Sequence, residues 1–392
     1  MTLAFTPNRS DGIATKSFRG PLGGIEHFIA LTADGGRDLA SQIAEIEERY
    51  AAALDGLALA EETAIFRRLF ISDAMNQAEI VRASELVQST PENPVAVSLI
   101  QQPPLPGAKL ALLAYHLSGD SSIRKHRLSK HDLLIEKNGR RHLWTAGLCA
   151  GQNTPHTSSE IQTRGVFTDL IDTLEGQGST LGDNCVRTWL YLKDVDVFYQ
   201  GMVDSRGAIF AEHGLNRDTH YIASTGIEGA CAHRYDLVAM DAYSNLDLDP
   251  RQVSYLNDFS RLCATKDYNV HFERGTRIAY ADRAHHFISG TASIDTRGDV
   301  VFLGDVLRQT EYALGHVEAL LRSGGACLDD LGHLIVYLRD PTDYARVHDF
   351  LSHALPGVPT VIVQGAVCRP QWLIEMEGIA IAPHDAPSLP SF

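Results

Sequence analysis

The sequence predicts an α+β protein with mixed sheets, built from three tandem copies of one β-β-α-β-α-β-β unit. Internal similarity is the first observation: segments beginning at Leu57, Ser179 and Ala326 each run from an acidic turn through a strand-like stretch to an Asp. The second observation is periodicity, because an amphipathic helix precedes each segment and two strand-like stretches close each copy. Together these observations predict one supersecondary unit repeated along the chain.

The elements of the unit follow in a fixed order. Strand pairs around 27–31, 142–148 and 287–294 are expected to open the three copies. The first helix then has apolar residues at helical spacing in each copy: Leu39, Ile43, Ile46, Tyr50 and Leu54; Val166, Leu170 and Leu174; and Ala313, Val317, Leu320 and Leu321. The central strand leads to an Asp suited to cap the second helix: 66–71 with Asp73, 186–192 with Asp194, and 334–338 with Asp340.

The joins between the copies have polar, turn-rich sequence. We therefore expect unit 1 at 1–125, unit 2 at 126–262 and unit 3 at 263–392. The basic run 124–127 is interpreted as a solvated linker, and the tail 382–392 is expected to be a loose end.

Composition excludes several classes of protein. A net charge of −15 argues against nucleic acid or an anionic membrane as partner. No apolar run is long enough to span a bilayer, and no signal-peptide core is recognisable, so we expect a cytoplasmic protein. The six cysteines show no CxxC and no metal-ligand spacing, which is typical of reduced thiols. The absence of a Walker loop and of a GxGxxG after a strand argues against nucleotide and dinucleotide folds. Nothing in the sequence requires a metal or an organic cofactor, so we expect neither.

Reactive side chains are densest near the C-terminus, in the stretch PTVIVQGAVCRPQWLIEME. A strand over 372–381 would place Glu375 and Glu377 on one face, with Cys368 and Arg369 in the turn before it. If this face lines a pocket, burial would raise the pKa of Glu375 and make it a proton donor. The residues alone leave open a half-buried strand with both carboxylates in water.

The third unit resembles the RidA (YjgF) family over most of residues 280–383. The matching residues are Ile288-Ser289-Gly290, Val336-Tyr337-Leu338-Arg339-Asp340, Pro359 and Ile374-Glu375-Met376-Glu377. RidA proteins are homotrimers with ligand sites in the clefts between subunits. The resemblance therefore implies that the three units form a covalent pseudo-trimer, a monomer with internal threefold pseudosymmetry whose copies are free to diverge.

The same resemblance implies a catalytic Glu at the position of Glu375. Aligned by eye, the second unit has Ala239 there and the first has Leu112, so one cleft would keep the acid. RidA imine deaminases hold the substrate carboxylate with an Arg that is replaced here by Val361, which disfavours imine hydrolysis.

Further motifs are similar to those of the chorismatases, a subgroup of this superfamily. They are Val367-Cys368-Arg369 with Glu375 downstream, GTASID at 290–295, and THYIASTGI at 219–227. The resemblance is to the 3-hydroxybenzoate-forming type and implies cleavage of chorismate with release of pyruvate. It implies that Glu375 protonates the enol methylene carbon and that Cys368 diverts the reaction to an aromatic product.

Chorismate is a dianion, and planar guanidinium groups suit carboxylates. The candidates in an otherwise acidic chain are Arg274, Arg277, Arg283 and Arg369. We expect Arg283 and Tyr280, which matches a RidA site tyrosine, to contact the substrate first. Gly290 is a further expected contact, and Tyr221 of the second unit could close the cleft or be a core aromatic.

Other outcomes remain open at this point. The product could include 4-hydroxybenzoate, or chorismate could be hydrolysed to a dihydroxycyclohexadiene carboxylate, against which Cys368 argues. In a different class of function, the cleft would bind a metabolite without catalysis, because a fold alone does not determine function.

Overall fold

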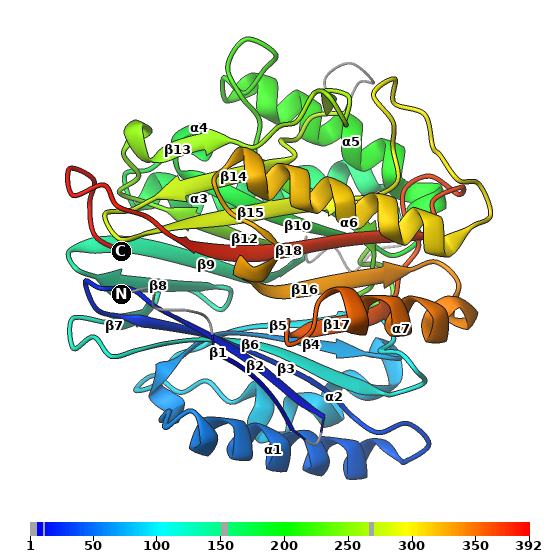
Figure 1. The fold of residues 1–392 in the computed structure, drawn as a ribbon, viewed down its shortest axis with the longest axis horizontal. Coiled ribbons are helices and arrows are strands. Elements are labelled where there is room, and N and C mark those ends of the chain that lie inside the picture. Colours follow the sequence, from blue (N-terminus) through cyan, green and yellow to red (C-terminus); the bar gives the residue numbers. More distant parts are fainter. Residues whose placement is uncertain (1–5, 11, 150–155, 266–269) are drawn as a thin grey trace.

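The chain folds into three six-stranded mixed sheets, which confirms the predicted α+β architecture of repeated units. The computed structural model describes residues 6–10, 12–149, 156–265 and 270–392. The helices lie on the outside of the molecule and the sheets lie between them (Figure 1).

The elements recur in the same order in each unit. The first sheet contains β1 (Thr6–Ser10), β2 (Ile13–Arg19), β3 (Ile25–Thr32), β4 (Ala64–Ile71), β5 (Ala96–Gln101) and β6 (Leu110–Ser118). The second contains β7 (Arg124–Arg127), β8 (Asp132–Lys137), β9 (Arg140–Cys149), β10 (Cys185–Leu192), β11 (Ala223–Glu228) and β12 (Val238–Asn245). The third contains β13 (Val253–Tyr255), β14 (Gly275–Ala279), β15 (Arg283–Thr291), β16 (Leu331–Leu338), β17 (Thr360–Gln364) and β18 (Ile374–Pro383).

The helices are α1 (Leu39–Gly56), α2 (Ala74–Arg82), α3 (Ser159–Gly176), α4 (Leu181–Asn184), α5 (Val195–Glu212), α6 (Val306–Ser323) and α7 (Tyr344–Ala354). The predicted caps are confirmed: Asp73, Asp194 and Asp340 accept backbone N–H groups at 3.2, 3.3 and 2.9 Å, at the starts of α2, α5 and the turn before α7. Across the described part of the chain, no helix has the length and apolar character needed to cross a membrane.

Strand pairing is the same in the three sheets. The central strand runs parallel to the strand that follows the second helix and antiparallel to the last strand. These triplets are β4 with β5 and β6, β10 with β11 and β12, and β16 with β17 and β18. The parallel strand is an edge of its sheet, so it is available to contact the next unit.

Each unit contains one strand more than predicted, because β1, β7 and β13 add an edge strand ahead of the expected pair. β7 occupies the run 124–127, which is therefore not a solvated linker. Lys125 Nζ donates to the carbonyl of Ala64 in the first unit at 3.0 Å. β13 belongs to the third sheet although it precedes residue 263, so that sheet begins before the expected boundary. Short polar edge strands carry little periodicity, which is why the sequence did not predict them.

The C-terminal tail is anchored, which corrects the expectation of a loose end for 382–392. Phe392 is 5% exposed, and its ring centroid lies 4.6 Å from that of His285. The backbone oxygen of Phe392 accepts hydrogen bonds from Lys137 and, at 2.8 Å, from Asn138 Nδ2. The groups that hold the tail come from β8, β15 and the turn after β8, so local sequence could not reveal the site.

A buried ion network joins the three units at the centre of the molecule. Arg68 on β4 donates to Asp241 Oδ2 on β12 through Nε at 3.2 Å and Nη2 at 2.9 Å. Arg187 on β10 pairs with Glu377 on β18, which also accepts the Tyr337 hydroxyl at 2.7 Å. Because Arg68 Nη1 lies 3.9 Å from Glu377 Oε1, one side chain of the first unit contacts charges of both other units.

Candidate active site

A cavity lies between the second and third units, where edge strand β11 contacts β15. The second unit contributes residues of α5 and β11, and the third contributes residues of β15, β18 and the loops beside them. The structure brings five of the candidate site residues to this cavity: Arg274, Gly290, Cys368, Arg369 and Glu375.

Glu375 is positioned by β18, which sets it opposite Tyr337 of the central strand. Its side chain is 6% exposed. Burial and, to a smaller extent, the charge of Glu377 raise the pKa of Glu375 to about 8, against the opposing effects of Arg274 and Arg187. A carboxyl with such a pKa keeps its proton at neutral pH, so it can serve as a general acid.

Gly290 makes room for this carboxyl. A Cβ at Gly290 would lie 2.2 Å from Glu375 Oε1 and 3.1 Å from Thr225 Cγ2. The N–H of Gly290 donates to Thr225 Oγ1 at 2.9 Å, so this donor already has a partner within the protein. Glycine at this position therefore allows β15 to approach the acid closely, and its direct contact with substrate stays a prediction.

Cys368 follows β17 and lines the same cavity. Burial raises the pKa of the Cys368 thiol to about 12, and the charge of Glu375 contributes. The thiol hydrogen-bonds with the side chain of Tyr199 on α5, which acts in the opposite direction. Cys368 is therefore a neutral thiol at neutral pH, and a group in that state is a poor nucleophile.

Three guanidinium groups line the cavity: Arg206, Arg274 and Arg369. Arg206 is 1% exposed and donates through Nη1 to Ser224 Oγ at 3.2 Å. Arg274 is 4% exposed. Arg369 donates to the carbonyl of Gly298 at 2.8 Å. In a chain of net charge −15, this cluster makes the cavity a local site for anions.

The structure does not bring Tyr280 and Arg283 to this cavity. Arg283 is fully buried and pairs with Glu26 at 2.8 Å, and the Tyr280 hydroxyl accepts a hydrogen bond from Asn245 at 3.1 Å. Arg283 begins β15 and Gly290 lies near its other end, a span of about 23 Å for an extended strand. The expected anion contact of Arg283 is thus replaced by a structural ion pair.

Tyr221 and Arg277 also lie outside the residues that line the cavity. Tyr221 is 6% exposed, and its ring packs between Phe210 and His271 at centroid distances of 6.2 and 5.4 Å, which fits the alternative of a core aromatic. Arg277 on β14 lies 3.5 Å from the ring nitrogens of His384. The second unit instead contributes the β11 residues 224–226.

Tyr199 and Arg206 are site residues that sequence reasoning missed. They lie seven residues apart on α5, so they share one face of the helix. Met202 and Ile209 are buried on the same helix. An Arg on the apolar face of an amphipathic helix is the signal that could have revealed them.

The counterparts of Glu375 in the other units are alanines. Each faces the residue three positions before the cap Asp: Glu375 faces Tyr337, Ala239 faces Tyr191, and Ala111 faces Phe70. The register confirms Ala239 and corrects Leu112 to Ala111. Neither counterpart can donate a proton, so the cavity between the second and third units differs chemically from its two equivalents.

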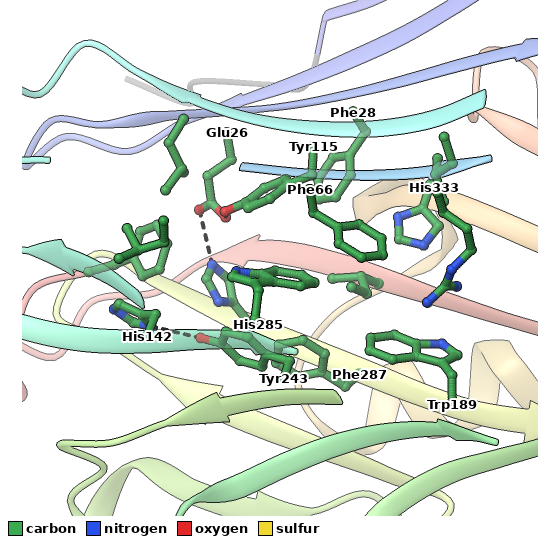
Figure 2. A pocket seen from close by; sticks show the side chains of 17 residues that line it. Glu26, Phe28, Phe66, Tyr115, His142, Trp189, Tyr243, His285, Phe287 and His333 are labelled. Atoms are coloured by element: carbon green, nitrogen blue, oxygen red, sulfur yellow. Dashed lines mark hydrogen bonds and ion pairs between the residues drawn. The ribbon is translucent and has the colours of Figure 1, made fainter. Parts of the chain in front are cut away.

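A second cavity lies at the centre of the molecule and is lined mainly by aromatic rings from all three sheets (Figure 2). Its carboxylate, Glu26, is held by Arg283 at 2.8 Å and by His285 at 3.0 Å. His142 Nδ1 lies 2.8 Å from the Tyr243 hydroxyl. These polar groups partner one another, so this cavity is part of the structural core that the three units share.

Comparisons with known proteins identify relatives. The model of the family described as Endoribonuclease L-PSP matches residues 277–382. A RutC family protein of Pyrococcus abyssi is 32% identical over 96 residues, which are 24% of this chain and 76% of that protein. The 3-aminoacrylate deaminase RutC of Acinetobacter baylyi is 29% identical, with the same coverage of both chains.

Among solved structures, the fold resembles the crystal structure of a chorismatase over 95% of this chain and 100% of the other. The TM-score is 0.62 and the sequence identity is 16%. This likeness shows a common fold for the whole three-unit chain, whereas the family model matches residues 277–382, within the third unit.

Proposed function

The chain belongs to the RutC family of RidA-like (endoribonuclease L-PSP) proteins, and we propose that it is a chorismatase that converts chorismate to 3-hydroxybenzoate and pyruvate. The observation that carries the proposal is a buried, protonated Glu375 in the same cavity as three guanidinium groups. The whole-chain likeness to a chorismatase supports it.

The first step is a proton transfer from Glu375 to the methylene carbon of the enolpyruvyl ether. This transfer turns the ether into an oxocarbenium ion and leaves Glu375 as a carboxylate. Water converts the oxocarbenium into a hemiketal, which breaks down to pyruvate and the ring diol. The neighbouring ring hydroxyl instead closes a cyclic ketal; the bond from that hydroxyl oxygen to the ring then breaks, the ring loses a proton, the other ring oxygen gains one, and pyruvate leaves. In both routes the proton lost by the attacking oxygen returns to the Glu375 carboxylate. The pKa of Glu375, about 8, suits a donor that must hold its proton at neutral pH and lose it in the transition state.

Substrate binding follows from charge. Chorismate carries two carboxylates, and Arg206, Arg274 and Arg369 offer planar donors around the cavity. The two carboxylates of chorismate would also screen these cations from Glu375. We infer that the arginines orient the dianion so that its enol methylene carbon faces the Glu375 carboxyl.

Cys368 separates the two product outcomes. Formation of 3-hydroxybenzoate and pyruvate consumes no water overall, whereas the dihydrodiol and pyruvate require one. A neutral thiol beside the ring leaves less room for an attacking water than a smaller side chain would. Interception by the ring hydroxyl is then favoured, and the ring can aromatise.

Incubation of the purified chain with chorismate in D2O tests the proposal. We expect 3-hydroxybenzoate and pyruvate in equal amounts, with one deuterium in each pyruvate methyl group from the transferred proton. No turnover would refute the enzyme and leave a metabolite-binding protein. If the dihydrodiol were the sole ring-containing product, the role of Glu375 would stand, but 3-hydroxybenzoate would be refuted as the product.

Replacing Cys368 by Ala should shift the product toward the dihydrodiol while chorismate is still consumed. The smaller side chain admits water, which competes with the ring hydroxyl for the oxocarbenium. Chromatographic separation of the products gives the ratio. Cys327→Ala is the control, because Cys327 is exposed and lies outside the cavity. An unchanged product ratio in Cys368→Ala would contradict the role of the thiol.

Gly290→Ala should lower kcat by about 100-fold with a small change in KM. The added methyl group would lie 2.2 Å from Glu375 Oε1 and must displace the carboxyl, and a displacement of ~1 Å costs on that order in rate. Thermal unfolding should change little, because the flexible end of a side chain can rotate away. Gly176→Ala is the matched control, since a Cβ there meets no atom of the described residues within 4 Å. A wild-type kcat in Gly290→Ala would contradict the proposed close approach.

A further inference from the structure

The junction between the first and second units contains a different set of reactive side chains. Cys149 ends β9, and Cys231 follows β11. Next to Cys231, the carbonyl of Ala230 accepts a hydrogen bond from the N–H of Gln101, at the end of edge strand β5 of the first unit, at 2.8 Å. The two sulfur atoms lie 3.1 Å apart and both cysteines are free thiols. Asp236, in the loop before β12, completes the group, and the three ligand atoms lie within 4.8 Å of one another.

The position of this group in the repeat is informative. Cys149 pairs across the sheet with Ala239, the residue that replaces the catalytic acid in this unit. Two thiols and a carboxylate therefore lie close to the position that lacks the acid. Cys149 comes from a strand, whereas Cys231 and Asp236 come from the loop between β11 and β12. The two cysteines are 82 residues apart, so no spacing motif predicted them.

Asp236 supplies an independent indication of a ligand. It is 7% exposed, and its Oδ1 has no hydrogen-bond partner among the residues that the structure describes. A buried carboxylate oxygen without a partner is costly, and a bound cation would satisfy it.

We propose that Cys149, Cys231 and Asp236 form a binding site for a thiophilic divalent cation, with Zn²⁺ as the best fit. Two sulfurs and one carboxylate oxygen are ligands that Zn²⁺ takes, and soft thiolates exclude Mg²⁺ and Ca²⁺. Tetrahedral geometry with Zn–S bonds of about 2.3 Å separates two sulfurs by about 3.8 Å, so the thiols must move apart by roughly 0.7 Å. Water takes the fourth position, and the two thiol protons pass to solvent when the metal binds.

Metal titration of the whole purified chain tests the site. The chain is stripped with a chelator, kept reduced, and titrated with Zn²⁺ against a chromophoric competitor. We expect one equivalent to bind with a Kd on the order of 0.1 µM or tighter, with release of protons. Co²⁺ in place of Zn²⁺ should give the near-ultraviolet thiolate-to-metal charge-transfer absorption, a readout that needs no variant.

Variants assign the ligands. Cys149→Ser and Cys231→Ser should each weaken Zn²⁺ binding by more than the roughly 10–100-fold that loss of an outer-shell partner costs. Cys327→Ser should bind like the wild type. Absence of charge-transfer absorption from the wild type, or equal Zn²⁺ affinity in wild type and Cys149→Ser, would overturn the proposal. The proposed ligands lie outside the cavity that contains Glu375, so chorismate turnover should persist in the chelated chain.

Discussion

Glu375→Gln is expected to lower chorismate turnover by about 1000-fold while leaving the fold intact. Gln has the same shape as a protonated Glu, but it has no acidic proton to deliver to the methylene carbon, and general-acid catalysis contributes about 10²–10⁴-fold. The rate of pyruvate release measures the effect. Glu311→Gln on the exposed face of α6 is the control and should keep the wild-type rate. Residual turnover within tenfold of wild type would exclude Glu375 as the proton donor.

The pH dependence gives a second readout of the same carboxyl. Because the pKa of Glu375 is about 8, the wild-type rate should fall as pH rises through that value. The pKa of Glu375 in the folded chain lies above the ordinary value of 4.5. The free energy of unfolding therefore decreases as pH rises from about 4.5 to 8, because the unfolded chain loses this proton first. Glu375→Gln removes that loss, and its urea midpoint at pH 8 should equal or exceed that of the wild type. A lower midpoint would attribute the lost activity to misfolding.

The fold was predictable because each of its signals is local. Apolar spacing predicted α1, α3 and α6, and the Asp caps indicated where the second helices begin. The alternation of side chains along β18 was enough to predict that Glu375 and Glu377 share one face of the strand. The edge strands β1, β7 and β13 and the anchored tail depend on partners far away in sequence, which no local signal reveals.

The sequence predicted that Glu375 and Cys368 lie close together, but it predicted only some of the arginines that line the same cavity. Arg283 and Arg274 both belong to one basic stretch, and a sequence does not say which end of a strand reaches a cleft. The structure turns Arg283 toward Glu26 and leaves Arg274 at the cavity. Arg206 comes from the second unit, and its contribution depends on how two units meet. This part of the site is thus a property of the interface between units.

Covalent linkage allows each cleft to diverge. A homotrimer with one sequence must build the same cleft three times. Here the cavity between the second and third units holds Glu375 with three arginines. At the corresponding position of the second unit, Ala239 lies opposite Cys149, which is grouped with Cys231 and Asp236. The price of this freedom is that the three units must assemble in one fixed arrangement, and the central ion network contributes to that assembly.

Arg68→Met is expected to destabilise the folded chain by about 3–5 kcal/mol, the cost of leaving one partner of a buried pair without its counter-charge. Arg68 and Asp241 are each about 1% exposed. Glu377 keeps its pairing with Arg187, so Asp241 is the charge left without an ionic partner. Met preserves most of the side-chain volume beside Trp189, over which the guanidinium lies at 4.7 Å. The free energy of unfolding in urea measures the loss.

A double-mutant cycle separates the ion pair from side-chain packing. Adding Asp241→Asn to Arg68→Met removes the uncompensated charge, so the double variant should be more stable than Arg68→Met alone. Arg164→Met is the matched control, because the Arg164–Glu212 pair is 48% and 53% exposed, and its loss should barely change the urea midpoint. Equal stability of Arg68→Met and Arg164→Met would show that the central network does not hold the three units together. Loss of stability in Arg68→Met that Asp241→Asn fails to restore would assign the effect to packing around Trp189.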